Sequence, residues 1–129
     1  MEFHHAGIAV NSIEDTSKWY LSLGYSLTET VFDPIQNVKI TFLKKDGHPL
    51  LELVQPADKA SPVYNILKKM GVTAYHFCYE VDNIQKTTEE LEKHDFKILV
   101  EPVHAAAFNN RNICFLYNVD VGLIELLEK

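Results

Sequence analysis

The 129-residue sequence has few cysteines and few basic residues, and it contains no long apolar run. Its two cysteines, Cys78 and Cys114, follow neither a CxxC nor a zinc-ribbon spacing, which argues against a cysteine-based zinc site. Both lie within apolar runs, so we expect buried free thiols. No stretch approaches the ~18 consecutive apolar residues of a membrane helix, and the first residues show no signal-peptide pattern. We therefore expect a cytoplasmic protein.

Positive charge is also scarce, because 12 Lys and Arg residues stand against 18 Asp and Glu residues, for a formal net charge of -6. An acidic surface repels nucleic-acid phosphates and anionic lipids, and no basic stripe with interleaved aromatics is present. We expect neither nucleic acid nor a membrane as a partner. Apolar residues make up 47% of the chain, which is enough for a hydrophobic core without disulfides.

The hydrophobic pattern predicts an α+β protein in which one order of elements occurs twice. In the first half, Ser12 caps a helix that ends near Leu21, and strands are expected at 3–10, 25–31, 38–43 and 49–54. In the second half, Asp82 caps a helix at 84–93, and strands are expected at 75–81, 96–100, 113–117 and 123–127. A short helix between Ser61 and Gly71 connects the halves. We expect one domain over residues 1–129, with modules at about 1–55 and 73–129 and a connector at about 56–72.

The two halves align at nearly constant offsets, which indicates an internal duplication. An offset of 71 carries His5 onto His76. An offset of 73 carries Glu52 onto Glu125, so the second half contains a two-residue insertion. Each half thus has the order βαβββ.

The duplication superposes two histidines in the first strands and two glutamates in the last strands. Each glutamate has aliphatic neighbours, and a carboxylate in an apolar strand is costly to bury unless a positive partner meets it. If each strand is considered alone, the glutamate could instead lie on a face of the strand that is exposed to solvent, where it needs no partner. If the halves pack about a pseudo-twofold axis, two imidazoles and two carboxylates converge, a donor set that suits nickel, cobalt, manganese, iron or zinc. We therefore predict a divalent-metal site formed by His5, Glu52, His76 and Glu125.

These residues and their surroundings resemble the vicinal oxygen chelate superfamily. The resemblance covers nearly the whole chain and lies in the segments His5–Val10, Leu51–Leu53, His76–Asp82 and Leu123–Leu126. It implies two tandem βαβββ modules that form a curved, cup-like mixed sheet, with helices outside and one divalent metal. The sequence is similar to two branches of the superfamily, glyoxalase I (lactoylglutathione lyase) and methylmalonyl-CoA epimerase. In both, the ligand positions fall on the four residues named above.

The resemblance implies an enzyme that transfers a proton at a carbon next to a carbonyl. Glu125 would be the principal base, and Glu52 would be a ligand and second base. We expect a glyoxalase-I-type lyase for methylglyoxal detoxification, which converts a methylglyoxal–thiol hemithioacetal to a lactoyl thioester. The resemblance also implies nickel or cobalt in preference to zinc or manganese, and a homodimer. We expect one chain to supply all four ligands, because a connector with its own helix separates Glu52 from His76.

Methylmalonyl-CoA epimerase, with an acyl thioester as substrate, is the alternative. The run Glu52–Pro56 is similar to the epimerases, whereas the segment His104–Arg111 lacks the glycines of the epimerase loop. Ala9 and Pro56 stand where glyoxalase I usually has an arginine and an asparagine. Two further functions are less favoured alternatives. A metal-free antibiotic-binding protein typically lacks the four metal ligands, which are all present here. An iron dioxygenase needs two histidines and only one carboxylate, whereas this sequence offers a second carboxylate.

Overall fold

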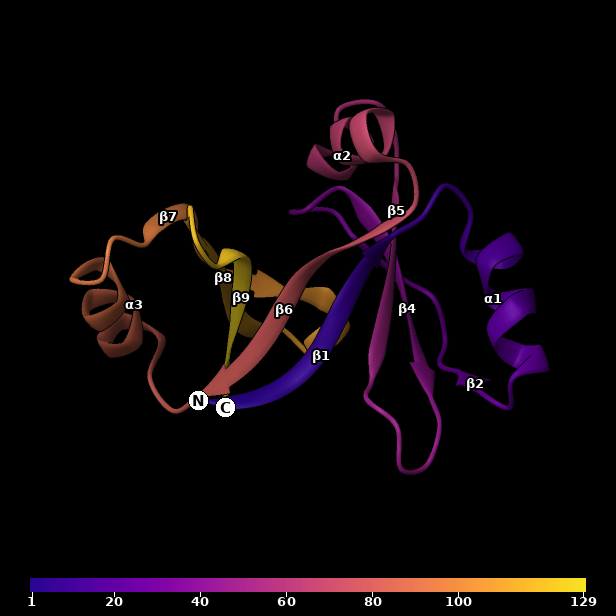
Figure 1. Ribbon diagram of the computed structural model, residues 1–129, viewed down its shortest axis with the longest axis horizontal. Coiled ribbons are helices and arrows are strands. Elements are labelled where there is room, and N and C mark those ends of the chain that lie inside the picture. The colour runs from indigo at the N-terminus through magenta and orange to yellow at the C-terminus, as the bar shows by residue number, and fades with distance from the viewer. The chain divides into compact units, whose positions relative to one another are not determined.

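The computed structural model describes all residues from Met1 to Lys129 and forms two compact units. One unit consists of His5–Tyr75, and the other consists of Met1–His4 together with His76–Lys129. The predicted order of one strand, one helix and then further strands occurs twice, with the strand after the first helix divided in two, so the α+β class is confirmed (Figure 1). None of the helices is both long and apolar enough to cross a membrane.

The unit His5–Tyr75 contains a mixed sheet and two helices. Its strand order is β2-β4-β5-β1, with β3 paired to β4, and β1 runs parallel to β5 whereas the other pairs are antiparallel. The elements are β1 (Glu2–Ala9), α1 (Ile13–Ser22), β2 (Ser26–Leu27), β3 (Val31–Asp33), β4 (Val38–Lys44), β5 (Leu51–Pro56) and α2 (Pro62–Met70).

The unit containing His76–Lys129 has the same plan. Its strand order is β6-β9-β8-β7, and β6 runs parallel to β9 whereas the other pairs are antiparallel. The elements are β6 (Thr73–Val81), α3 (Ile84–Glu92), β7 (Lys97–Ala105), a 3-10 helix (Ala106–Phe108), β8 (Arg111–Asn118) and β9 (Gly122–Glu128).

The two units also share one strand register. Gly7 is the partner of Glu52 across β1 and β5, and Cys78 is the partner of Glu125 across β6 and β9. The offsets of 71 and 73 relate these two pairs. A slip of one residue would turn every side chain to the other face of the sheet, so the shared register supports the duplication at the level of single residues.

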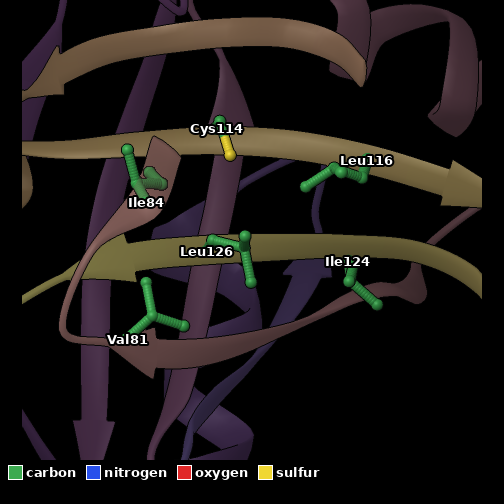
Figure 2. Close-up of a cluster of buried hydrophobic side chains, with 6 residues drawn as sticks. All are labelled: Val81, Ile84, Cys114, Leu116, Ile124 and Leu126. Carbon is green, nitrogen blue, oxygen red and sulfur yellow. The ribbon is translucent and has the colours of Figure 1, made fainter. Parts of the chain in front are cut away.

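One face of each sheet packs on the helix of its own unit. Figure 2 shows this core in the second unit, where side chains come from the end of β6, the start of α3 and strands β8 and β9: Val81, Ile84, Cys114, Leu116, Ile124 and Leu126. The first unit has the equivalent core at Val10, Ile13, Leu43 and Leu53. Because strand side chains alternate, Glu52 and Glu125 point to the opposite face of each sheet.

Several local predictions are confirmed at atomic detail. Ser12 caps α1 by accepting the N–H of Asp15 at 3.1 Å. Helix α2 begins at Pro62, and Gly71 caps its C-terminal end with a φ of 72°, which suits a residue without a Cβ. Cys78 and Cys114 are free thiols with no exposed surface.

Three other local predictions are wrong. Asn83 and not Asp82 caps α3, because the Asn83 side chain accepts the N–H of Lys86 at 2.8 Å. In the segment 25–31, only the short β2 and the first residue of β3 pair with β4. Strand β7 continues to Ala105, because antiparallel pairing with β8 extends past the two register shifts that follow Ile98 and Val100.

Candidate metal centre

A histidine and a glutamate meet inside the unit His5–Tyr75. The Nε2 atom of His5 lies 3.4 Å from Oε1 of Glu52. Both residues are buried, with 0% and 2% of their surface exposed. His5 precedes Gly7, the strand partner of Glu52, by two residues, so alternation places the imidazole and the carboxylate on one face of the sheet.

The other unit repeats this contact. The Nε2 atom of His76 lies 3.1 Å from Oε2 of Glu125, and the two residues are 4% and 3% exposed. His76 again precedes the strand partner of its glutamate, Cys78, by two residues. The four predicted ligands are therefore all buried, and the structure brings them together as two equivalent His–Glu pairs.

The burial of the glutamates decides between the two hypotheses for them, a solvent-exposed side chain or a metal ligand. The hypothesis of a solvent-exposed side chain is wrong, because Glu52 and Glu125 are both buried. A buried carboxylate costs several kcal/mol unless positive charge meets it, which a protonated imidazole or a metal cation can supply. Each pair offers one imidazole nitrogen and one carboxylate oxygen, which are donors that divalent metals accept. The residues present fit a divalent metal.

A phenylalanine ring lies against each histidine. The ring centroids of Phe42 and His5 are 5.8 Å apart with the planes at 78°, and those of Phe115 and His76 are 5.3 Å apart at 88°. Each phenylalanine is also the cross-strand partner of the glutamate of its pair. Sequence reasoning missed both rings, although the offset of 73 that relates the glutamates also relates Phe42 to Phe115.

The thiol of Cys114 lies near the second pair but on the core side of β8. Burial raises its pKa to about 12, and the negative charge of Glu125 adds to the shift. A thiol with such a pKa stays protonated at neutral pH. Cys114 therefore belongs to the core and offers no thiolate ligand.

The segment His104–Arg111 turns without glycine. Asn109 and Asn110 both have positive φ, 54° and 63°, a conformation that asparagine tolerates better than most residues. The Nδ1 atom of His104 lies 2.9 Å from the carbonyl oxygen of Asn110, which closes the turn. The guanidinium of Arg111 donates to Glu80 at 2.5 Å and to the carbonyl of Glu128 at 2.7 Å, so it is engaged within its own unit.

The chain is similar to methylmalonyl-CoA epimerases over almost its whole length. It is 32% identical to the mitochondrial methylmalonyl-CoA epimerase of Homo sapiens over 127 residues, which cover 95% of this chain and 71% of that protein. The solved structure of a hypothetical protein from Bacillus halodurans C-125 is 31% identical, with a TM-score of 0.88 over 99% of this chain and 94% of that chain. Methylmalonyl-CoA epimerase from Mycobacterium tuberculosis, at 24% identity, has the same fold, with a TM-score of 0.86 over 98% of this chain and 87% of that chain.

These similarities correct the function expected from the sequence. The glyoxalase-I-type lyase is wrong, and methylglyoxal detoxification is wrong with it, because the human and bovine relatives are both epimerases named for a CoA thioester. The four ligand positions could not separate the two branches, since both have them. The missing glycines of His104–Arg111 do not separate this chain from the epimerases, and the segment turns with Asn109 and Asn110 in the left-handed conformation.

A family sequence model matches most of the chain, including three of the four candidate ligands. The sequence model of the Glyoxalase/Bleomycin resistance protein/Dioxygenase superfamily matches residues 4–115, which hold His5, Glu52 and His76. The structural similarity over 99% of the chain extends to β9, the strand of Glu125. The chain therefore belongs to the Glyoxalase/Bleomycin resistance protein/Dioxygenase superfamily.

Proposed function

We propose that this chain is a metal-dependent epimerase that inverts the carbon between the thioester and the carboxylate of methylmalonyl-CoA. The observation that carries the proposal is the 32% identity to the human epimerase over 95% of the chain. The two buried His–Glu pairs supply the chemistry that such a reaction needs.

We also propose that both pairs bind one divalent metal ion, with His5, Glu52, His76 and Glu125 as its ligands. Support comes from the donor types, from the burial of all four residues and from their equivalence under the duplication. A single divalent cation balances two buried carboxylates. Two nitrogen and two oxygen donors would hold a divalent metal and would leave it able to bind oxygen atoms of a substrate.

Nickel or cobalt remains our prediction for the preferred metal, and zinc or manganese is the alternative. Stripped protein reconstituted with each metal in turn should give the highest turnover with nickel or cobalt. The highest turnover with zinc would contradict this preference, but it would not contradict the assignment of the four ligands.

The reaction requires a proton to leave one face of a carbon and a proton to arrive at the other. When bound, the metal supplies a Lewis acid that stabilises negative charge on the thioester oxygen. We propose that the carboxylate of Glu125 takes the proton from the carbon, whose electron pair moves toward the carbonyl. Glu52 would serve the opposite face as the second base, where it would take up a proton from solvent and deliver it to the carbon while Glu125 keeps the proton it has removed. General acid–base catalysis of this kind contributes about 10²- to 10⁴-fold to a rate.

The assembly of the site stays a prediction that subunit mixing can test. We propose a homodimer in which each chain supplies all four ligands of one site. Two inactive variants, His5→Ala and Glu125→Gln, are combined and allowed to exchange subunits. No activity should return, because every site keeps its lesion. Recovered activity would mean that ligands come from two chains.

The function itself is tested with a single epimer of methylmalonyl-CoA. Metal-loaded protein is incubated with that epimer, and the appearance of the other epimer is followed by chromatography. We expect interconversion up to equilibrium, and the same rate for Glu29→Gln, which changes an exposed glutamate. A metal-loaded protein that forms none of the second epimer would refute the proposed function.

A further inference from the structure

We infer that Phe42 and Phe115 are positioning residues that hold the two histidine rings of the metal centre in place. The inference rests on the metal site of the proposed function. It adds two residues that do not bind the metal themselves.

The contact in the first unit has the geometry of an edge-to-face pair. The rings of Phe42 and His5 are 5.8 Å apart at 78°, within the 4.5–7 Å range over which such pairs are attractive. A histidine ring rotates about its last side-chain bond in a broad energy well, so the side-chain bonds alone do not fix the direction of Nε2. In this structure Nε2 of His5 points to Glu52 at 3.4 Å. A ring packed against the imidazole restrains that rotation.

The second unit repeats the arrangement with a tighter contact. Phe115 and His76 are 5.3 Å apart at 88°, and Nε2 of His76 lies 3.1 Å from the carboxylate of Glu125. Phe115 is 8% exposed, so its ring also keeps water from that side of the pair. In both units a phenylalanine makes the same edge-to-face contact with the histidine of the pair. This repetition indicates that the ring serves the His–Glu pair.

Neither phenylalanine lies on the core side of its sheet. Phe115 stands between Cys114 and Leu116, and both neighbours point into the core of the second unit (Figure 2). Alternation therefore turns Phe115 to the face that carries Glu125, its cross-strand partner. The same reasoning places Phe42 on the face of Glu52. Packing of the helix-side core does not require either ring.

A misdirected imidazole weakens a metal site even when every ligand is present. Residues that orient metal ligands typically contribute about 10- to 100-fold to metal affinity or activity. We expect Phe115→Leu and Phe42→Leu each to raise the Kd for Co²⁺ by roughly tenfold, because leucine keeps the apolar contact but not the flat ring. The visible spectrum of bound Co²⁺ should change as well, since it reports ligand geometry directly.

The experiment titrates Co²⁺ into the metal-stripped full chain and records Kd, the visible spectrum and the thermal unfolding of the metal-free protein. Phe96→Leu is the matched control in the second unit, because Phe96 packs on the core and has no role in the pairs. Phe32→Leu is the control in the first unit, where Phe32 is exposed. Phe115→Tyr and Phe42→Tyr keep an aromatic ring, so both variants should keep most of the wild-type affinity for Co²⁺ and the wild-type spectrum. If Phe115→Leu fails to fold, the less buried Phe42 carries the test in the other unit.

The outcomes separate this inference from the proposed function. Weaker binding with an altered spectrum in the leucine variants, but in neither control, supports positioning by the two rings. Leucine variants with the wild-type Kd and spectrum overturn it and leave the metal site intact. A wild-type chain that takes up no Co²⁺ refutes the proposed metal site, and the inference with it.

Discussion

The side chain of Gln55 accepts a hydrogen bond of 2.9 Å from the backbone N–H of Ile13, the first residue of α1. The other unit repeats the bond, since Glu128 accepts the N–H of Ile84 at 2.8 Å. Each acceptor follows the glutamate of the His–Glu pair in its unit by three residues. The bond therefore ties the strand that carries the glutamate to the helix on the opposite face of the sheet.

Removal of the Glu128 side chain should destabilise the fold. Glu128→Ala removes the partner of the first helical N–H and the acceptor of Asn112 Nδ2 at 3.3 Å. Loss of such a partner costs about 1–2 kcal/mol. Urea unfolding followed by circular dichroism measures the change. Glu92→Ala, at the exposed end of α3, should change the free energy of unfolding by no more than about 0.5 kcal/mol. Equal effects in both variants would show that the bond is not stabilising.

Glu80 should make stability depend on acid pH. The hydrogen bond from Arg111 holds the pKa of Glu80 below its ordinary value of 4.5, and the charge of Arg111 adds to this against the effect of burial. The folded-state pKa is thus the lower one, so the unfolded chain binds the proton more readily. The contribution of Glu80 is present above pH 4.5 and is lost as the pH falls through the folded-state pKa.

The test compares wild type with Glu80→Gln in urea unfolding from pH 7 down to about pH 3, a window set by the direction of that shift. The variant should be less stable near neutral pH, and the difference should shrink as the solution becomes acid. The effect is modest, because both partners are partly exposed. A difference that stays constant with pH would rule out this ion pair as its source.

The thiols should resist alkylation in the folded protein. Burial raises the pKa of Cys114 to about 12, and neither Cys78 nor Cys114 exposes any surface. Because the thiolate is the reactive form, iodoacetamide at pH 8 should modify neither residue within hours. Mass spectrometry after the same treatment in urea should show two modified cysteines. Rapid modification of native protein would mean that the core opens readily.

Metal removal should lower the thermal stability of the wild-type chain. A ligand that binds only the folded state stabilises it by about 2.7 kcal/mol at a concentration 100 times its Kd. Treatment with a chelator should therefore reduce Tm, and added nickel or cobalt should restore it. His76→Ala should have a low Tm that neither chelator nor metal changes. A wild-type Tm that is insensitive to the chelator would be evidence against the site.

The sequence was sufficient to predict the order of the elements and to select four candidate ligands, because histidine and glutamate are rare in apolar strands and stand out when both halves show them. Phe42 and Phe115 could not be found in the same way, since a phenylalanine in a strand matches the general hydrophobic pattern. Their role becomes visible only when the ring contacts with His5 and His76 are known.

Other differences have local physical causes. Asp82 and Asn83 are both good helix caps, and only the bond to Lys86 separates them. The end of β7 depends on pairing with β8, which no local pattern encodes. The substrate expected from the sequence is wrong, because the missing glycines of one loop are a weaker signal than similarity to an epimerase over 95% of the chain. That loop turns with Asn109 and Asn110 in the left-handed conformation.

The central claim is that two glutamates, one from each unit, move the proton at the inverted carbon. The most direct test is the exchange of that hydrogen for deuterium from D₂O in methylmalonyl-CoA, followed by mass spectrometry together with epimer formation. Bound metal is measured in each sample, so that loss of the ion is separated from loss of the base. Wild-type protein and Glu92→Gln should exchange and epimerise at the same rate, whereas Glu125→Gln and Glu52→Gln should epimerise at least about 100-fold more slowly. Wild-type rates of exchange and epimerisation in either glutamine variant would contradict the account.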